Sequence, residues 1–241
     1  MQTFFIADLH LQPAEERTAQ IFFDFLGYEA TEAEALYILG DLFMAWPGDD
    51  DRSPFNEKVK GALRKLVQKG TRVFLMPGNR DFLLGDSFAE ESGCTLLTDP
   101  TIIDLYGRRT LLTHGDNLCG RDILLTSFRG IMGRKRIRKF FLSLPLVVRK
   151  SLALAAHGVS SVRGLLLSRK HLKSIVYQEG LQAMLANDLT QLIHGHIHIP
   201  FIDEPSVNNT KFRHIVLAAW QDVGSVLIYR ENGQCDFVWI D

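Results

Sequence analysis

Apolar segments with the character of β-strands recur along this 241-residue chain, and each is followed at once by a turn that carries Asp, His or Asn. The first three are residues 3–7, 35–39 and 71–76, and stretches with helical periodicity separate them. Strands that alternate with helices indicate βαβ units and a largely parallel sheet. In such sheets, ligands bind beyond the carboxyl ends of the strands. The pattern therefore predicts an α/β fold whose site is assembled from strand ends.

The second half of the chain continues this pattern. A hairpin is expected over 101–113, and its second strand runs into a His-Gly-Asp motif at 114–116. Further on, His194, His196 and His198 occupy alternate positions. Alternate side chains of an extended segment face the same way, and imidazole is the commonest metal ligand, so this segment has the outline of a metal site. Three more strands are expected at residues 212–218, 224–229 and 236–240.

The strand ends supply seven candidate metal ligands with oxygen or nitrogen donors: Asp8, His10, Asp41, Asn79, His114, His196 and His198. Seven ligands are too many for one tetrahedral zinc ion, but they suit two divalent cations that share a carboxylate. Asp41, alone on its turn, is the natural shared ligand. Two cations about 3.5–4 Å apart can activate a water and clamp a phosphoryl oxygen, so we expect hydrolysis of a phosphoester or phosphoanhydride. His194 is left outside this set and is expected to be packed or to support it.

The formal net charge of −1 conceals a strongly basic segment at residues 121–173. This segment contains 13 Lys and Arg and a single acid, Asp122, together with long apolar runs. Basic amphipathic helices with Phe and Leu suit an anionic membrane surface or a lipid substrate. The alternative is a solvated basic face on an ordinary packed helical insertion. A nucleic-acid partner is less favoured, because no stacking aromatics are interleaved with the basic residues.

We therefore divide the chain into a core, residues 1–120 and 174–241, and a helical insertion, residues 121–173.

No apolar run approaches the roughly 18–20 residues of a spanning helix, and no secretory signal opens the sequence, so we expect a cytoplasmic protein. The three cysteines are scattered without C-x-x-C spacing, which indicates neither a disulfide framework nor a zinc ribbon. Trp220 and Trp239 are expected in the core.

Five motifs follow one another along the chain: Asp8-x-His10, Gly40-Asp41, Gly78-Asn79-Arg80-Asp81, His114-Gly115-Asp116 and Gly195-His196-x-His198. In these motifs and their order the chain resembles the calcineurin-like metallophosphoesterases, which share a two-metal centre on an α/β sandwich. The resemblance implies that one metal is held by Asp8, His10, Asp41 and His198, and the other by Asp41, Asn79, His114 and His196. It also implies two divalent cations as cofactors, usually Mn²⁺, which fits a ligand set without thiolate.

Within that family, the motifs are most similar to those of enzymes that hydrolyse UDP-2,3-diacylglucosamine in lipid A biosynthesis. The run Leu142-Ser-Leu-Pro145-Leu extends the similarity into the insertion. The resemblance implies water attack at the α-phosphorus of this nucleotide lipid, which releases UMP and 2,3-diacylglucosamine 1-phosphate (lipid X). It implies a peripheral protein at the cytoplasmic face of the inner membrane, whose insertion forms a helical cap over the acyl chains. It implies no nucleic-acid partner and no obligate protein partner.

Two alternatives come from other classes of function. The chain could be another calcineurin-like phosphodiesterase, for cyclic nucleotides or nucleic acid, which would need neither an acyl chain nor a UDP group. It could also be a scaffold without catalysis, or a peripheral membrane-binding module. Scaffolds of this family generally lose metal ligands, whereas all seven candidates are present here.

The resemblance also implies roles for individual side chains. Asp41 and His114 are expected in the catalytic centre. Asn79 and Arg80 are expected to be catalytic and to bind phosphoryl oxygens of the substrate, Arg80 through charge-assisted hydrogen bonds. His196 is expected to contact the substrate as well as a metal. Two further acids are expected to orient ligands: Asp81 and Asp116.

Several residues of the insertion are candidate substrate contacts. Asp122 is expected to orient the nucleoside or residues of the cap, although a local ion pair explains it equally well. Ser160 matches a serine that contacts substrate in the related enzymes. The chain departs from their pattern at Gly164 and Leu167, which stand where an asparagine and a lysine are expected. Arg163, Ser168, Arg169 and Lys170 are candidate substitutes after a small shift in the alignment.

Overall fold

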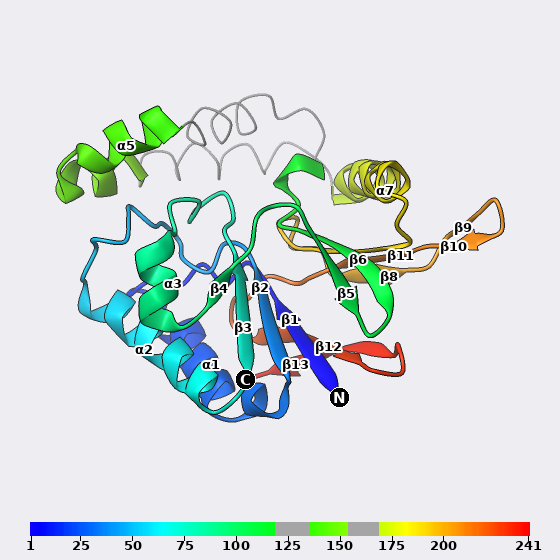
Figure 1. Cartoon of the computed structure of the whole chain (residues 1–241), viewed down its shortest axis with the longest axis horizontal. Helices are drawn as coiled ribbons and strands as arrows, with labels where there is room; N and C mark the ends of the chain where they lie inside the picture. Colours follow the sequence, from blue (N-terminus) through cyan, green and yellow to red (C-terminus); the bar gives the residue numbers. More distant parts are fainter. Residues whose placement is uncertain (119–134, 154–168) are drawn as a thin grey trace.

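The computed structural model describes residues 1–118, 135–153 and 169–241. Two β-sheets lie face to face, helices cover the outer face of each, and the described part of the insertion lies above one edge of the sandwich (Figure 1). The expected α/β sandwich is therefore confirmed, and its two sheets bring strand ends from distant parts of the chain together.

The first sheet has six strands in the order β13-β12-β1-β2-β3-β4. Their bounds are Gln2–Ile6 (β1), Ala35–Leu39 (β2), Arg72–Met76 (β3), Thr95–Leu96 (β4), Gly224–Arg230 (β12) and Cys235–Ile240 (β13). Strands β1 to β4 are parallel, whereas β12 and β13 pair antiparallel. Thr3 lies opposite Ala35, which in turn lies opposite Arg72. The three expected parallel strands are therefore neighbours, and their carboxyl ends share one edge.

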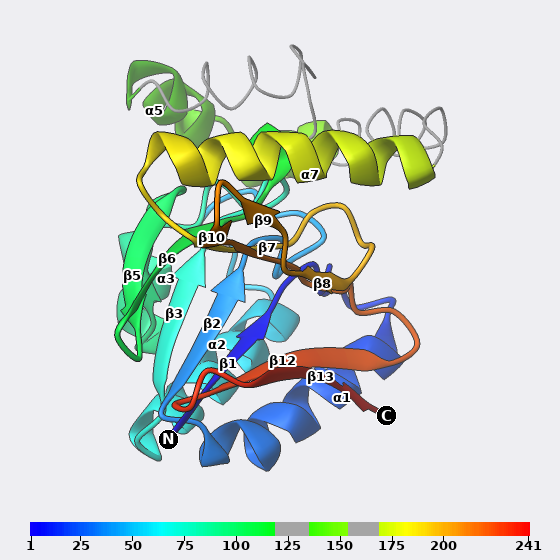
Figure 2. The ribbon, with the colours of Figure 1, turned by 90° about the vertical axis from the view of Figure 1, so that its right-hand side faces the viewer.

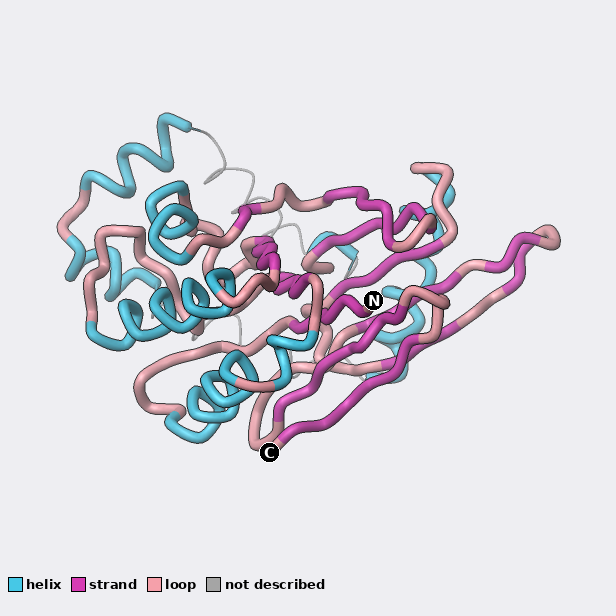
Figure 3. Tube along the Cα trace, turned by 60° about the horizontal axis from the view of Figure 1, so that its bottom comes forward, coloured by secondary structure: helices cyan, strands magenta, loops and turns pink. Residues whose placement is uncertain are grey.

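The second sheet has five strands in the order β5-β6-β7-β11-β8. Their bounds are Thr101–Leu105 (β5), Arg108–Thr113 (β6), Gln191–His194 (β7), Phe201–Asp203 (β8) and Arg213–Val216 (β11). Strands β6, β7 and β11 are parallel, and β5 and β8 pair antiparallel at the two sides. A two-stranded hairpin of β9 (Ser206–Val207) and β10 (Thr210–Lys211) projects from the body (Figure 3).

Three helices cover the outer face of the first sheet: α1 (Glu16–Gly27), α2 (Pro54–Gln68) and α3 (Asp86–Ser92) (Figure 2). The helical spacing of Ile21, Phe22, Phe25 and Leu26 places all four on one face of α1, and all are buried. Helix α2 begins at Pro54, a residue that suits the first turn because its missing N–H has no partner there anyway.

Helix α7 (Arg169–Ala186) lies along the outer face of the second sheet (Figure 2). Met184 of this helix packs with Leu111 of β6 and Leu192 of β7, and Val176 packs with Val216 of β11. Short 3₁₀ turns follow α1 (η1, Glu29–Glu32) and β6 (η2, Asp116–Leu118). The layers are therefore helix, sheet, sheet and helix.

The pleat of β1 divides its side chains between two cores. Phe4 and Ile6 point to the helices, whereas Phe5 and Ala7 point to the second sheet. Alternate side chains of a strand face opposite sides, so a strand with apolar residues on both sides must be covered on both. The continuous apolar run in this strand thus follows from its place between two layers.

Several features differ from the sequence expectations. Each sheet is mixed rather than largely parallel, and the short strands β4, β8, β9 and β10 carry too few residues to show a period. Trp220 is buried as expected, but the prediction for Trp239 is wrong, because this residue on β13 is 54% exposed. Strand β13 forms the edge of its sheet and has one solvent-facing side.

The described part of the insertion includes α5 (Lys135–Ser143), the helical residues 146–153 and residues 169–173 at the start of α7. The expected boundary at 173/174 falls inside α7, and the division into core and insertion stays a prediction. Among the helices of the described residues, none is long and apolar enough to span a membrane.

Candidate metal centre

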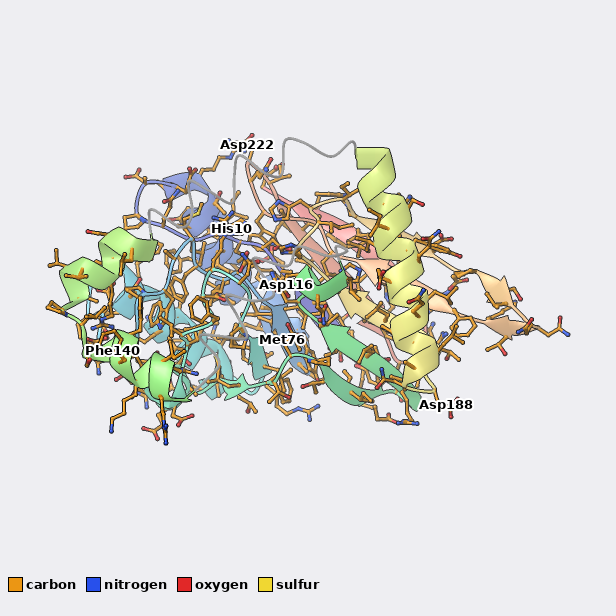
Figure 4. All side chains as sticks on the ribbon, turned by 90° about the horizontal axis from the view of Figure 1, so that it is seen from above. His10, Met76, Asp116, Phe140, Asp188 and Asp222 are labelled. Carbon is orange, nitrogen blue, oxygen red and sulfur yellow. The ribbon has the colours of Figure 1, made fainter. Side chains whose placement is uncertain are left out.

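Five strand ends converge at the top of the sandwich. Asp8, Asp41 and Asn79 follow the neighbouring strands β1, β2 and β3, while His114 and His196 follow the neighbouring strands β6 and β7. Seen from above, His10 and Asp116 lie near the middle of the molecule, between α5 and α7 (Figure 4). The edges of both sheets therefore contribute to one site, as the strand-end pattern predicts.

Backbone hydrogen bonds join the turns that carry these residues. Asp8 N donates to Gly40 O at 3.1 Å, and His10 N donates to Asp41 O at 3.0 Å. Across the two sheets, the N–H of His196 donates to Asp8 Oδ2 at 2.7 Å. Backbone hydrogen bonds thus fix the turn after β1 to the turn after β2, and the Asp8 carboxylate itself fixes the turn after β7.

One group of side chains contains Asp8, His10, Asp41 and His198. His198 Nε2 lies 3.4 Å from Asp8 Oδ1 and 3.3 Å from His10 Nε2. His10 Nδ1 lies 3.8 Å from Asp41 Oδ2. The donor atoms of Asp8, His10 and His198 are close enough together to ligate a single ion.

The other group contains Asp41, Asn79, His114 and His196. His114 Nε2 lies 2.9 Å from Asn79 Oδ1, 3.1 Å from His196 Nδ1 and 3.7 Å from Asp41 Oδ1. The donor atoms of Asp8, Asp41 and His114 also form a cluster that could hold an ion. Asp41 therefore stands between the two groups, with Oδ2 toward His10 and Oδ1 toward His114.

Most of these candidate ligands have a left-handed backbone: Asp8 (φ 55°), His10 (φ 52°), Asp41 (φ 52°), His196 (φ 71°) and His198 (φ 56°). Residues other than glycine rarely adopt this conformation, and it persists where the surrounding structure enforces it. Such strain concentrates at functional sites. The turns therefore hold these side chains in orientations that a relaxed backbone would not give.

Three glycines of the motifs make room for the ligands. A Cβ atom at Gly40 would collide with the His114 imidazole, one at Gly78 with Asp41, and one at Gly195 with the Asp8 carboxylate. The glycines are therefore required by close packing of backbone against ligand side chains, and Gly40 also has a positive φ of 91°.

Burial and mutual charge shift the pKa values of the acidic ligands in opposite directions. Burial raises the pKa of Asp41 to about 7. Burial also favours the neutral form of Asp8, but the neighbouring imidazoles of His198 and His114 outweigh it and hold the pKa of Asp8 well below its usual range. The two neighbouring carboxylates thus lose their protons in different pH ranges, as expected when like charges share a buried site.

The pKa values of the histidines in the two groups also shift in opposite directions. Burial lowers the pKa of His10 to about 3 and that of His196 to about 4, so both are neutral at pH 7. Burial by itself also lowers the pKa of His114, but the carboxylates of Asp41 and Asp8 outweigh it and raise this pKa to about 9. Without a cation, the centre therefore retains a proton on His114.

The donor atoms fit a pair of cations. His114 Nδ1 donates to the Leu39 carbonyl at 3.0 Å, so in the neutral ring Nε2 is an acceptor that faces a second acceptor, Asn79 Oδ1. Two acceptors at 2.9 Å need a proton or a cation between them. Within the described part of the chain, Asp8 Oδ1 and His10 Nδ1 are also buried without a hydrogen-bond partner. Unsatisfied buried donors and acceptors of this kind are costly unless an ion binds them.

Two further acids support the turns. Asp81 is fully buried and accepts hydrogen bonds from Gly78 N at 2.7 Å and from Phe43 N at 3.2 Å, which ties the turns after β2 and β3 together. Burial raises the pKa of Asp81. Asp116 is buried beside the centre and contributes to the raised pKa of His114. Both residues lie where the sequence predicts supporting acids.

Arg80 lies beside Asp41. Its backbone N–H donates to Asp41 Oδ1 at 2.9 Å, and its side-chain Nε lies 3.5 Å from Asp41 Oδ2. The side chain is 18% exposed and contacts Met44 Sδ through Nη1 at 3.1 Å. A guanidinium is thus held at the rim of the candidate metal centre, next to the shared carboxylate.

Not every candidate residue joins this site. Asp122, Ser160 and Arg163 lie outside the described residues. His194 is fully buried and its ring contacts His214, a residue that sequence reasoning missed. The sequence signal for His214 is weak: it is a polar residue of a short strand, between Arg213 and the apolar Ile215 and Val216.

Comparison with known proteins agrees with this geometry. The family model of the calcineurin-like phosphoesterases matches residues 1–200. A protein of Salmonella paratyphi B named UDP-2,3-diacylglucosamine hydrolase is 42% identical over 229 residues, which is 94% of each chain, and a protein of the same name from Salmonella arizonae gives the same values. A solved archaeal phosphodiesterase covers 100% of both chains with a TM-score of 0.50 and 12% sequence identity, a likeness of fold alone.

Proposed function

The chain belongs to the calcineurin-like phosphoesterase family, and on that premise we propose that it hydrolyses the pyrophosphate bond of UDP-2,3-diacylglucosamine. Water attacks the α-phosphorus, and the products are UMP and 2,3-diacylglucosamine 1-phosphate. Relatives that carry the corresponding name share 42% of their residues with this chain over 94% of its length, which supports the same substrate.

The convergence of two ligand groups on Asp41 is the observation that carries the proposal. Asp8, His10, Asp41 and His198 would hold one cation, and Asp41, Asn79, His114 and His196 the other. When bound, two divalent cations activate a water and stabilise the charge on phosphoryl oxygens. Manganese is the proposed metal, because all the donors are oxygen or nitrogen and none is a thiolate.

The residues of the chain position the phosphate. Arg80 lies at the rim of the centre with part of its side chain exposed. From there its guanidinium can donate charge-assisted hydrogen bonds to phosphoryl oxygens, which strengthen as negative charge develops. The ion pair with Asp41 keeps the side chain in place before substrate arrives. Asn79, which precedes Arg80 in the same turn after β3, can add a neutral contact to the phosphate.

Contacts between the insertion and the core support the cap assignment. Arg149 is only 2% exposed, and its guanidinium pairs with both oxygens of Asp50 while Nη1 also donates to Pro47 O at 2.7 Å. Lys150 Nζ lies 2.9 Å from Asp51 Oδ1. The acidic loop after β2 thus holds the basic insertion above the sheet edge where the candidate metal centre lies.

The outer face of the insertion supports a lipid substrate. Several of its apolar side chains are exposed, among them Phe140 (68%) and Val147 (76%), and the exposed basic residues Arg136 and Lys139 lie close to Phe140 in sequence. On the inner face, Ile137 packs against the core. Exposed apolar side chains beside basic ones suit acyl chains and anionic lipid surfaces. We therefore include peripheral association with the cytoplasmic face of the inner membrane in the proposal.

The test is release of UMP from UDP-2,3-diacylglucosamine by metal-stripped protein, with and without added Mn²⁺. We expect UMP and the lipid monophosphate only when metal is present, and no release by Asp41→Asn. Hydrolysis of bis(4-nitrophenyl) phosphate, a small activated phosphodiester, is measured in parallel. If the protein cleaves the small ester in a metal-dependent way but releases no UMP, the two-metal centre is supported. The proposed substrate is then excluded, and another phosphodiester takes its place.

A further inference from the structure

Two buried histidines lie directly beneath the candidate metal centre without belonging to either ligand group. His194 ends β7 and His214 lies in β11, and their Nε2 atoms are 2.9 Å apart. Both side chains are fully buried. A contact this short between two imidazoles requires that one nitrogen donates and the other accepts.

The neighbouring atoms determine which nitrogen donates. His194 Nδ1 lies 2.9 Å from the carbonyl oxygen of Gly195, which can only accept, so Nδ1 carries the proton. In the neutral ring His194 Nε2 is then an acceptor, and His214 Nε2 must be the donor. His214 Nδ1 is left unprotonated, consistent with its lack of a hydrogen-bond partner among the described residues.

The acceptor at the end of this chain lies in the turn that carries two candidate ligands. Gly195 O accepts from His194 Nδ1 and from Ile197 N, both at 2.9 Å. The same turn places His196 and His198 in left-handed conformations. A second hydrogen bond to this carbonyl therefore helps to hold a strained segment whose geometry decides where both ligand imidazoles lie.

Packing against helix α7 and Phe201 fixes the orientation of the His214 ring. A Cβ atom at Gly180 of α7 would come within 2.5 Å of His214 Cε1, so the helix backbone lies directly against the ring. The Phe201 ring packs edge-on at a centroid distance of 5.2 Å. The imidazole therefore has little room to turn, and its Nε2–H stays directed at His194.

We propose that His214 is a positioning residue of the metal centre. Its Nε2–H holds His194 in the tautomer that donates to Gly195 O, and this bond keeps the turn with His196 and His198 in its metal-binding shape. The inference rests on the two-metal centre of the proposed function. It does not depend on the identity of the substrate.

The hydrogen-bond order can be measured directly in the wild-type protein. Two-bond ¹H–¹⁵N correlation spectra distinguish the two neutral tautomers of each histidine. We expect His194 to be protonated at Nδ1 and His214 at Nε2. The reverse pattern in either ring would overturn the inference, whether or not any metal binds.

The positioning role is tested by the affinity for Mn²⁺, measured by titration calorimetry. His214→Leu removes the donor and should weaken binding by about tenfold or more, the usual effect of removing a partner that orients a ligand. His214→Gln keeps an N–H near the position of Nε2 and should stay within about threefold of wild type. Equal affinity in all three proteins, or equal loss in both variants, would contradict the role.

A matched control separates positioning from general loss of stability. Gln191 begins β7, and its side chain donates to Thr110 Oγ1 at 2.8 Å and accepts from the Tyr229 hydroxyl at 3.2 Å. Gln191→Met also removes buried hydrogen bonds from the same strand, but it leaves Gly195 O untouched. It should lower the thermal stability and leave the Mn²⁺ affinity unchanged. If wild-type protein bound no Mn²⁺, the proposed function would fail, while the tautomer spectra would still decide the hydrogen-bond order.

Discussion

His10 Nε2 and His198 Nε2 face each other at 3.3 Å although 188 positions separate the two residues in the sequence. Burial lowers the pKa of His10 to about 3, so this ring is neutral at pH 7 and the contact is a hydrogen bond in which one Nε2 donates to the other. A cation can replace the shared proton and bind the lone pairs of both rings. The contact is therefore a place where the folded protein gains stability from metal, and it leads to the first prediction.

Metal should stabilise the folded protein. A ligand at about 100 times its Kd adds about 2.7 kcal/mol when it binds only the native state. For a domain of this size, that corresponds to a rise in Tm of about 5–10 °C. Calorimetric scans of metal-stripped protein with and without Mn²⁺ measure the shift. His198→Ala should reduce it, and a Tm independent of Mn²⁺ in the wild type would contradict a metal site.

Metal affinity should increase with pH. The pKa of His114 is raised to about 9, so in the metal-free protein this ring is protonated at pH 7 and must lose its proton to become a ligand. Affinity should therefore fall by about tenfold for each pH unit below 9. Below pH 7 the dependence should steepen, because the pKa of Asp41 is raised to about 7. His10 and His196 are already neutral and should contribute nothing there.

The measurement is calorimetric titration with Mn²⁺ at pH 6, 7.5 and 9, in two buffers of different ionisation enthalpy. The buffer dependence at pH 7.5 should show release of about one proton per protein. Affinity that is constant across this pH range would rule out His114 as a protonated ligand.

A methyl group at Gly40 should destroy the site. Gly40→Ala places a Cβ against the His114 imidazole at a residue with a φ of 91°, so the ring must move. Gly107→Ala is the matched control, because Gly107 has a φ of 82° but no atom within 4 Å of the added Cβ. Both variants should lose about 1–2 kcal/mol from the backbone strain.

Only Gly40→Ala should also lose turnover, by about 100-fold or more, because the displaced His114 no longer points to Asp41. Denaturant unfolding and initial rates on the small phosphodiester distinguish the two effects. Activity retained in Gly40→Ala would show that the position of His114 does not matter.

Breaking the ion pair between Arg149 of the insertion and Asp50 of the core should change substrate selectivity. Arg149→Met removes the ion pair between the buried Arg149 guanidinium and the largely exposed Asp50 carboxylate while keeping an apolar stem, so the insertion should detach from the loop after β2. We expect kcat/KM for the lipid substrate to fall by about tenfold or more, since hydrogen bonds to a charged group are worth about 1.5–3 kcal/mol. Hydrolysis of bis(4-nitrophenyl) phosphate should change less than about threefold, because the candidate metal ligands stay in place.

Two further variants control this experiment. Arg230→Met breaks the exposed pair with Asp236 on the far side of the sandwich and should affect neither substrate. Asp50→Ala should reproduce the loss seen in Arg149→Met, and the double variant should add little, because both changes break the same contact. A parallel loss on both substrates would indicate global destabilisation instead of a cap.

Exposed apolar side chains of the insertion should bind lipid surfaces. Phe140→Ser removes an exposed ring whose burial is worth about 1.5–3 kcal/mol, so partitioning onto vesicles with anionic phospholipid should fall by about tenfold. Vesicle sedimentation measures the bound fraction. Trp239→Ser, at an exposed aromatic on β13, is the control and should bind like the wild type. Equal binding of all three proteins would place the lipid-binding surface elsewhere.

Much of the site could be predicted because its signals are local. An apolar run of five residues such as Ala35–Leu39 indicates a buried strand, and a turn that ends in Gly40 and Asp41 follows from the residues themselves. The seven candidate ligands were all identifiable in this way, and the structure brings every one of them to the same place.

Other features were decided only by tertiary structure. The burial of Arg149 against Asp50, the exposure of Trp239 and the contact between His194 and His214 each depend on which distant segments meet. The sequence by itself determines periodicity, turn chemistry and the kind of ligand at each strand end, because these act over a few neighbouring residues. Which sheet a strand joins, and which polar residues are paired in the interior, is set by packing and hydrogen bonding summed over the whole chain.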